Sequence, residues 1–109
     1  MAKYKKRYNK EHYQKHKSMS RKSRLKCQYG ITIEDYDNLF AKQDGLCAIC
    51  GKMETYKHYK GTICRLSIDH NHTTGAVRGL LCQKCNAALG FLDEDIIRML
   101  KMIEYIEND

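Results

Sequence analysis

Four cysteines in two Cys-x-x-Cys pairs give the strongest chemical signal in the sequence: Cys47 with Cys50, and Cys82 with Cys85. Four thiolates from two such pairs satisfy the tetrahedral coordination of zinc, and a site with four protein ligands leaves no open position for a substrate. Disulfides and a redox role are the alternatives, but two pairs without a surrounding βαβ pattern favour zinc. We therefore expect a structural zinc ion bound by all four cysteines.

A second group of polar residues lies in and just after the long segment between the two pairs. Residues 51–81 number 31, whereas a simple four-cysteine ribbon has about 15–20 residues there. The motif Asp-His-Asn-His occupies 69–72, and Asn86 directly follows the last cysteine of the second pair. A zinc ion bound by both pairs would hold the strand end with Asp69 and His70 against the helix with Asn86. The sequence thus predicts one site with a metal-binding oxygen from each segment.

Each of these three residues also has a purely structural interpretation. Asp69 could cap a turn, His70 could be a core histidine with its hydrogen bonds satisfied, and Asn86 could be the N-cap of a helix. These interpretations do not explain why all three groups occur at the ends of one segment closed by cysteine pairs. Their combination favours a catalytic site.

The residues before the first cysteine pair show helical patterns. Residues 8–29 are good helix formers without Gly or Pro, and Gly30 is placed to cap such a helix at its C-terminus. Thr32 followed by Asp35 is close to a capping box and predicts a second helix over 33–42.

A strand, a short helix and a longer helix are expected further along the chain. Apolar and polar residues alternate at 66–69, which predicts a half-buried strand, and a short apolar run follows at 77–81. A short helix is expected over 83–89. Residues 93–107 predict an amphipathic helix that packs against the core, with its apolar stripe formed by Ile96, Ile97, Leu100, Ile103 and Ile106. The expected fold class is therefore small α+β.

Positive charge is concentrated at the N-terminus. Residues 1–26 contain eleven Lys or Arg and the single acid Glu11, whereas residues 27–109 contain nine bases and twelve acids. Such asymmetry favours a partner rich in phosphates, and nucleic acid is the first candidate, although a solvated basic tail is the alternative. The candidate DNA-binding residues of this arm are Lys5, Lys6, Arg7, Arg21, Lys22 and Arg24.

A chain of 109 residues fits one compact domain with an appendage. We expect a basic helical DNA-binding arm at 1–30 and a domain containing the zinc site at 31–109. No run of the sequence resembles a signal peptide or a membrane span. We therefore expect a cytoplasmic protein with no membrane partner. The reducing conditions of the cytoplasm also favour zinc over disulfides.

Two stretches resemble the recombination endonuclease VII family of HNH nucleases. They are Cys-Ala-Ile-Cys-Gly at 47–51 and the run from Asp-His-Asn-His to Asn-Ala-Ala-Leu-Gly at 69–90. The resemblance covers roughly 29–92, including the lead-in Tyr-Gly-Ile-Thr-Ile-Glu-Asp-Tyr at 29–36. It implies a ββα-metal fold, also called a His-Me finger, stapled by zinc and flanked by N- and C-terminal helices.

The resemblance also implies a role for each site residue. Asp69 and the side-chain oxygen of Asn86 would coordinate Mg²⁺, Mn²⁺ or a similar ion, His70 would be the general base, and His72 would assist at the scissile phosphate. Their chemistry agrees, because these ions prefer oxygen ligands and a neutral imidazole is suited to proton abstraction. Arg78 could contact a DNA phosphate or brace the fold.

The function implied is metal-dependent hydrolysis of phosphodiester bonds in DNA, by nicking or double-strand cleavage, leaving 5′-phosphate and 3′-hydroxyl ends. A non-catalytic zinc-stabilised DNA-binding module is the alternative. Both a monomer and a homodimer are compatible with the sequence. A phage origin, and with it the cytoplasm of a bacterial host, would suit the family.

Overall fold

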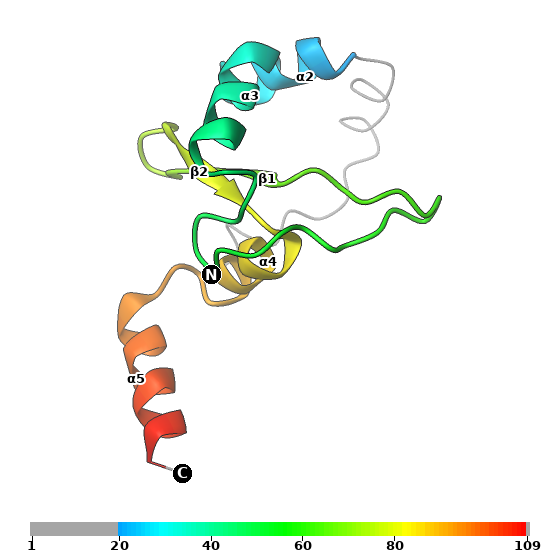
Figure 1. The fold of residues 1–109 in the computed structure, drawn as a ribbon. Helices are drawn as coiled ribbons and strands as arrows, with labels where there is room; N and C mark the ends of the chain where they lie inside the picture. The colour runs from blue at the N-terminus through cyan, green and yellow to red at the C-terminus, as the bar shows by residue number, and fades with distance from the viewer. Residues whose placement is uncertain (1–19, 109) are drawn as a thin grey trace.

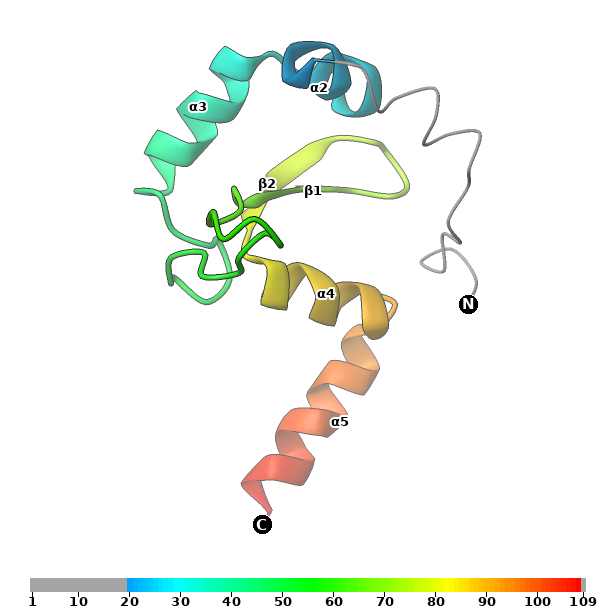
Figure 2. The same ribbon diagram turned by 90° about the vertical axis from the view of Figure 1, so that its right-hand side faces the viewer.

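The computed structural model describes residues 20–108. Within them lie four helices and a two-stranded antiparallel sheet, which confirms a small α+β fold. The order is α2 (Arg21–Tyr29), α3 (Ile33–Lys42), β1 (Ser67–His70), β2 (Val77–Leu81), α4 (Gln83–Phe91) and α5 (Ile96–Glu107). Figures 1 and 2 show α2 and α3 on one side of the strand pair and α4 on the other. None of the described helices combines the length and the apolar character needed to cross a membrane.

The ends of α2 and α3 follow from local capping. The left-handed conformation of Gly30, with φ of 70°, ends α2. Thr32 Oγ1 accepts a hydrogen bond from the Asp35 amide at 3.0 Å, and Asp35 Oδ2 accepts one from the Thr32 amide at 2.9 Å. These reciprocal bonds form the capping box that starts α3 and confirm its expected bounds. The helix expected over 8–29 is confirmed only for its last nine residues, because Ser20 has an extended backbone and caps the start of α2. Residues 8–19 lie outside the described residues.

The hairpin of β1 and β2 carries an irregularity at the end next to its connecting loop. Asp69 pairs with Gly79, but the next residue, His70, pairs with Val77, so that Arg78 is an extra residue in β2. Such bulges bend a strand and change the direction of the side chains beside them. The loop between the strands is closed by Asn71, whose side-chain oxygen accepts hydrogen bonds from the amides of two loop residues at 2.8 and 3.0 Å.

Helix α4 follows the hairpin directly and begins at the second cysteine pair. Cys82 is its N-cap, and the sulfur accepts a hydrogen bond from the Cys85 amide. Glu54, from the long loop between α3 and β1, accepts a second one from the Gln83 amide at 2.7 Å. A carboxylate is favourable at a helix N-terminus, where amide groups lack partners and the dipole is positive. Because Cys82 occupies the N-cap, the interpretation of Asn86 as an N-cap residue is wrong.

The hydrophobic core lies where α2, α3, the hairpin and the start of α4 meet. Its buried members are Leu25, Tyr36, Cys47, Leu66, Leu80, Leu81 and Cys82. Gln43 links α3 to β2, because its amide donates to the Leu80 carbonyl at 3.0 Å and accepts from the Leu80 amide at 2.9 Å. A core of this size stabilises a small domain only marginally, so a metal ion would add much of the stability. Leu25 belongs to this core although it lies within the arm expected at 1–30. The division of the chain at residue 30 stays a prediction.

The expectation that the last helix packs against the core is wrong. Helix α5 forms over most of the expected range, but the five residues of its apolar stripe are between 51% and 70% exposed. Figures 1 and 2 both show α5 extending away from the rest of the fold. The direction is set before the helix starts, because Asp93 and Glu94 both have φ of 53° and turn the chain after α4.

Candidate functional site

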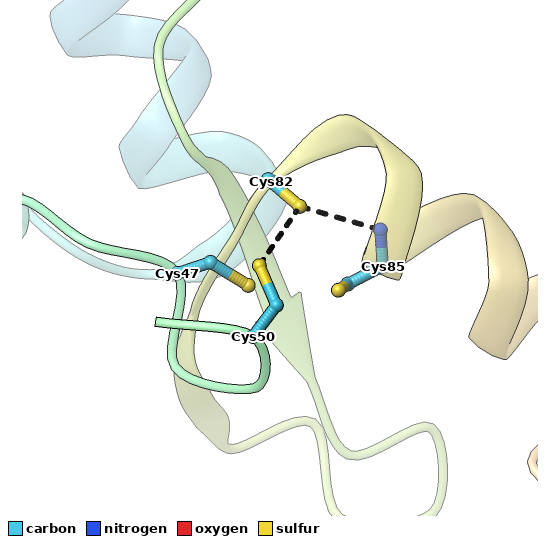
Figure 3. Close-up of side chains that lie close together, drawn as sticks. All are labelled: Cys47, Cys50, Cys82 and Cys85. Atoms are coloured by element: carbon cyan, nitrogen blue, oxygen red, sulfur yellow. Dashed lines mark hydrogen bonds between the residues drawn. The ribbon is translucent and has the colours of Figure 1, made fainter. Parts of the chain in front are cut away.

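The four cysteines of the two pairs meet at one point between the loop after α3 and the start of α4 (Figure 3). Their sulfur atoms all lie within 4.8 Å of one another, and the sulfurs of Cys50 and Cys82 are 3.8 Å apart. Zinc–sulfur bonds of about 2.3 Å give a tetrahedron with edges of about 3.8 Å. The cluster therefore has the ligand type, number and spacing that zinc requires, and the expected zinc site is supported.

The protonation chemistry of the cluster also fits a cation. Burial alone would raise the pKa of Cys47, but hydrogen bonds from neighbouring backbone amides and from Cys50 lower it to about 6. Burial and the other three sulfurs raise the pKa of Cys85 to about 12. The first thiolate therefore forms readily and the last only with difficulty, because negative charge accumulates among the sulfurs. A zinc ion would favour four thiolates together.

A second site is a pocket of about 230 Å³ between β1 and α4. The four residues expected to be catalytic all line it: Asp69, His70, His72 and Asn86. The remaining lining residues are Tyr29, Ile68, Leu89, Gly90 and Glu94. Residues from β1, the hairpin loop and α4 are thus brought together, as the cysteine pairs on either side of the long loop predicted.

Asp69 and His70 both reach this pocket although they are neighbours in a strand. Side chains of consecutive strand residues normally point to opposite faces. The irregularity of the hairpin falls between these two residues, where the register shifts. We attribute their common orientation to this irregularity, which is a frequent arrangement beside functional sites.

Three rings form one wall of the pocket. The His70 and His72 rings have centroids 4.6 Å apart, and Tyr29, from the end of α2, meets the His70 ring in an edge-on arrangement at 5.7 Å. Burial raises the pKa of Tyr29 above its ordinary value, so its hydroxyl stays neutral at physiological pH. The aromatic contact restricts the orientation of the His70 imidazole.

Arg78 connects two carboxylates at the rim of the pocket. Its Nε and Nη2 atoms donate to the two carboxylate oxygens of Asp69 at 2.8 and 3.1 Å, and Nη2 also lies 2.7 Å from Glu94 Oε1. The hydrogen bonds to Asp69 and then Glu94 raise the pKa of Arg78, which therefore stays charged. The other oxygen of Glu94 lies 3.3 Å from His72 Nε2. In this structure Arg78 braces the site.

The pocket offers few ligands to a second metal ion. Within residues 20–108, the four cysteines form the only group of three or more Cys, His, Asp or Glu side chains at ligand spacing. Asp69 and Asn86 supply one carboxylate and one amide, which are oxygen ligands of the kind Mg²⁺ and Mn²⁺ prefer. The donor set therefore fits an open site completed by water and phosphate, provided that Asp69 is released by Arg78.

Residues 22–108 match the family described as recombination endonuclease VII. The chain belongs to this family. The matched range includes both cysteine pairs, the pocket and α5. The resemblance seen in the motifs is thus confirmed and extends past their end.

Two phage proteins are similar to this family member over most of its length. It is 41% identical to the Gene 59 protein of Mycobacterium phage D29 over 90 residues, which are 82% of this chain and 51% of the relative. It is 40% identical to the Gene 59 protein of Mycobacterium phage L5 over 92 residues, 84% of this chain and 52% of the relative. The chain thus spans about half the length of these relatives. No solved structure matches significantly.

The basic residues expected to bind DNA differ in their surroundings in this member of the endonuclease VII family. Lys22 and Arg24 are exposed on α2, whereas the guanidinium of Arg21 lies 4.8 Å from the centre of the Tyr36 ring. Arg21 therefore makes a cation–π contact with the core residue Tyr36. Lys5, Lys6 and Arg7 lie outside the described residues.

The sequence analysis did not identify two polar residues of the pocket and two residues that hold its elements in place. Tyr29 and Glu94 line the pocket, Gln43 anchors β2, and Glu54 caps α4. Tyr29 was part of the family motif and could have been examined on that ground. No local sequence pattern indicates the roles of Glu94, Gln43 and Glu54, because their contacts are with residues far away in the sequence.

Proposed function

We propose that this protein is a metal-dependent DNA endonuclease of the HNH type, with β1, β2 and α4 as its ββα-metal core. It hydrolyses phosphodiester bonds and leaves 5′-phosphate and 3′-hydroxyl ends. One observation carries the proposal: Asp69, His70, His72 and Asn86 come from three segments and line one pocket. Membership of a family described as endonucleases supports the reaction class.

His70 is the general base in this proposal. Its imidazole is at the end of β1, half-buried and held at an angle to the Tyr29 ring. From there it takes a proton from the water that attacks the phosphorus. His72 is exposed beside it and contacts the scissile phosphate.

Asp69 and Asn86 are the proposed ligands of a divalent ion, Mg²⁺ or Mn²⁺. When bound, such an ion stabilises charge on the phosphoryl group and on the leaving oxygen. The four cysteines take no part in the chemistry, because a zinc ion with four protein ligands has no open position. Their part is to fix β1 and α4 relative to each other.

DNA is the proposed substrate, and its backbone is the expected contact. Lys22 and Arg24 on the exposed face of α2 are the described residues best placed for phosphates. In this proposal Arg78 is turned toward Asp69 until DNA and the divalent ion bind. Whether one or both strands are cut depends on whether the protein acts as a monomer or a homodimer.

One observation favours a second function, a non-catalytic zinc-stabilised DNA-binding module. Both oxygens of Asp69 are engaged by Arg78, as in a structural ion pair. In such a module the pocket would only hold the hairpin on α4. The two functions differ in whether His70 is needed for cleavage.

Cleavage of supercoiled plasmid tests the proposal. The zinc-loaded protein is incubated with plasmid in Mg²⁺, in Mn²⁺, and without a divalent ion, and His70→Ala is compared with His58→Ala. His58 lies in the loop before β1 and lines a different pocket, which makes it a matched control. We expect metal-dependent nicking or linearisation by the wild type and by His58→Ala, and a loss of about 10²-fold or more in His70→Ala.

Zinc content and DNA affinity are measured on the same preparations. Full activity in His70→Ala would remove His70 from the mechanism. If all three proteins bind DNA but none cleaves plasmid, branched or single-stranded DNA, the binding module becomes the correct function.

A further inference from the structure

Three charged side chains form a chain of contacts at the rim of the pocket. Arg78 Nη2 lies 3.1 Å from an Asp69 oxygen and 2.7 Å from Glu94 Oε1. The second Glu94 oxygen lies 3.3 Å from His72 Nε2. Glu94 therefore contacts two residues of the rim, and it is the one carboxylate in this chain of contacts without an assigned function.

The arrangement poses a problem for the proposed chemistry. A divalent cation at Asp69 would have to share its carboxylate with the guanidinium that now takes both oxygens. Two positive groups at one carboxylate repel each other, more strongly in a partly buried pocket than in water. Arg78 must therefore loosen its hold on Asp69 when the cation binds. It then needs a different partner for its charge.

An unfavourable backbone conformation holds Glu94 where it can be the second partner of Arg78. Asp93 and Glu94 both have φ of 53°, a left-handed conformation that glycine adopts without cost. The Glu94 amide donates to the Leu89 carbonyl at 3.1 Å, which fixes this turn after α4. Non-glycine residues in such conformations are enriched at functional sites. At Glu94 this conformation belongs to a residue whose carboxylate contacts Arg78 and His72.

We propose that Glu94 is a positioning residue that keeps Arg78 and His72 at the rim of the pocket and takes over the Arg78 guanidinium when Asp69 binds a divalent cation. This inference rests on the proposed function. Glu94 itself contacts neither the cation nor the DNA. Its negative charge offsets that of Arg78, so that Asp69 is shared less strongly with the guanidinium.

Replacement of Glu94 by glutamine isolates the charge. Glu94→Gln keeps the size and a hydrogen-bond acceptor, but it leaves Asp69 as the only charged partner of Arg78 in this chain of contacts. We expect the affinity for Mn²⁺ to fall about two- to fivefold, which corresponds to the loss of one partly exposed ion pair. Glu94→Asp keeps the charge and should remain closer to the wild type.

The experiment measures Mn²⁺ binding to the zinc-loaded protein without DNA, by electron paramagnetic resonance of the free ion. Asp69→Asn identifies the binding that belongs to the pocket. Asp93→Asn is the matched control, because it removes an acid from the same turn that does not line the pocket. Arg78→Ala should bind Mn²⁺ more tightly than the wild type, and adding Glu94→Gln to it should have a smaller effect than in the wild type.

Cleavage gives an independent measurement with the same variants. In Glu94→Gln the Mn²⁺ concentration for half-maximal cleavage should rise, while the rate at saturating Mn²⁺ changes less. A structural role would instead lower the unfolding temperature and leave Mn²⁺ affinity unchanged. Zinc content is compared throughout.

The outcomes separate this inference from the proposed function. Equal Mn²⁺ affinity in the wild type and Glu94→Gln, or an equal loss in Asp93→Asn, overturns the role of Glu94 and leaves the nuclease intact. Absence of Asp69-dependent Mn²⁺ binding in the wild type overturns the metal-dependent mechanism itself. If Glu94→Gln loses zinc, the test rests on Glu94→Asp. The charge-based role is rejected if Glu94→Asp keeps the zinc content of the wild type but its affinity for Mn²⁺ is as low as that of Asp69→Asn.

Discussion

The hydroxyl of Tyr36 on α3 donates a hydrogen bond of 2.6 Å to the backbone carbonyl of Leu66, the residue before β1. Both residues belong to the buried core. This contact spans the whole long loop with the first cysteine pair and joins the N-terminal helices to the hairpin that carries the pocket.

Tyr36→Phe should destabilise the protein by about 1–3 kcal/mol, because the Leu66 carbonyl is left without this partner in the core. Urea denaturation of the zinc-loaded protein measures the loss. Tyr59→Phe is the control, because Tyr59 is 87% exposed, and a surface substitution of this kind changes stability by less than about 0.5 kcal/mol. Equal stability of the two variants would show that the hydrogen bond contributes nothing.

Stability should fall at alkaline pH through the same residue. Burial raises the pKa of Tyr36 above its ordinary value of 10.0, with Arg21 and Arg65 acting in the opposite direction. Below that ordinary value the hydroxyl is neutral in both states and its full contribution is present. As pH rises past it, the unfolded chain ionises first, so that stability is lost until the folded protein ionises as well. The loss between about pH 8 and about pH 10.5 should be smaller in Tyr36→Phe, as urea denaturation at both values would show.

Removal of zinc should unfold the domain rather than merely inactivate it. Structural zinc contributes about 10–16 kcal/mol in small zinc domains, as much as the total stability of an ordinary domain. We expect chelation, or Cys82→Ala, to abolish cooperative unfolding and reduce helical circular dichroism. Cys64→Ser is the control, since Cys64 lies outside the cluster. A cooperative transition at an unchanged temperature after complete zinc removal would contradict this prediction.

Loss of exposed charge on α2 should weaken DNA binding in a salt-dependent way. Lys22→Ala with Arg24→Ala should lower the slope of log affinity against log salt, by about 0.9 for each phosphate contact that is lost. Lys101→Ala on α5 is the control at an exposed position. Substitution is a cleaner test than truncation through residue 26, because Leu25 is part of the core. The same slope in the double variant and the wild type would show that α2 does not contact phosphates.

Features encoded in short stretches could be predicted from the sequence. The two Cys-x-x-Cys pairs specify the ligand set of the zinc site because each tight turn places two sulfurs together. The capping box of Thr32 and Asp35 fixes the start of α3, and Gly30 fixes the end of α2. The gathering of Asp69 and Asn86 could also be predicted, because the cysteines on either side of the long loop converge.

Contacts between distant side chains were decided only by the tertiary structure. From the sequence, Arg78 could either contact a DNA phosphate or brace the fold. The register irregularity that makes Arg78 an extra residue, and the turn that brings Glu94 to it, depend on how the hairpin and α4 pack. The exposure of α5 is of the same kind. Its periodicity predicts a helix with an apolar stripe, but periodicity is a property of one segment, whereas burial requires a second segment to pack against. The turn at Asp93 and Glu94 directs α5 away from the core, and its apolar stripe stays exposed.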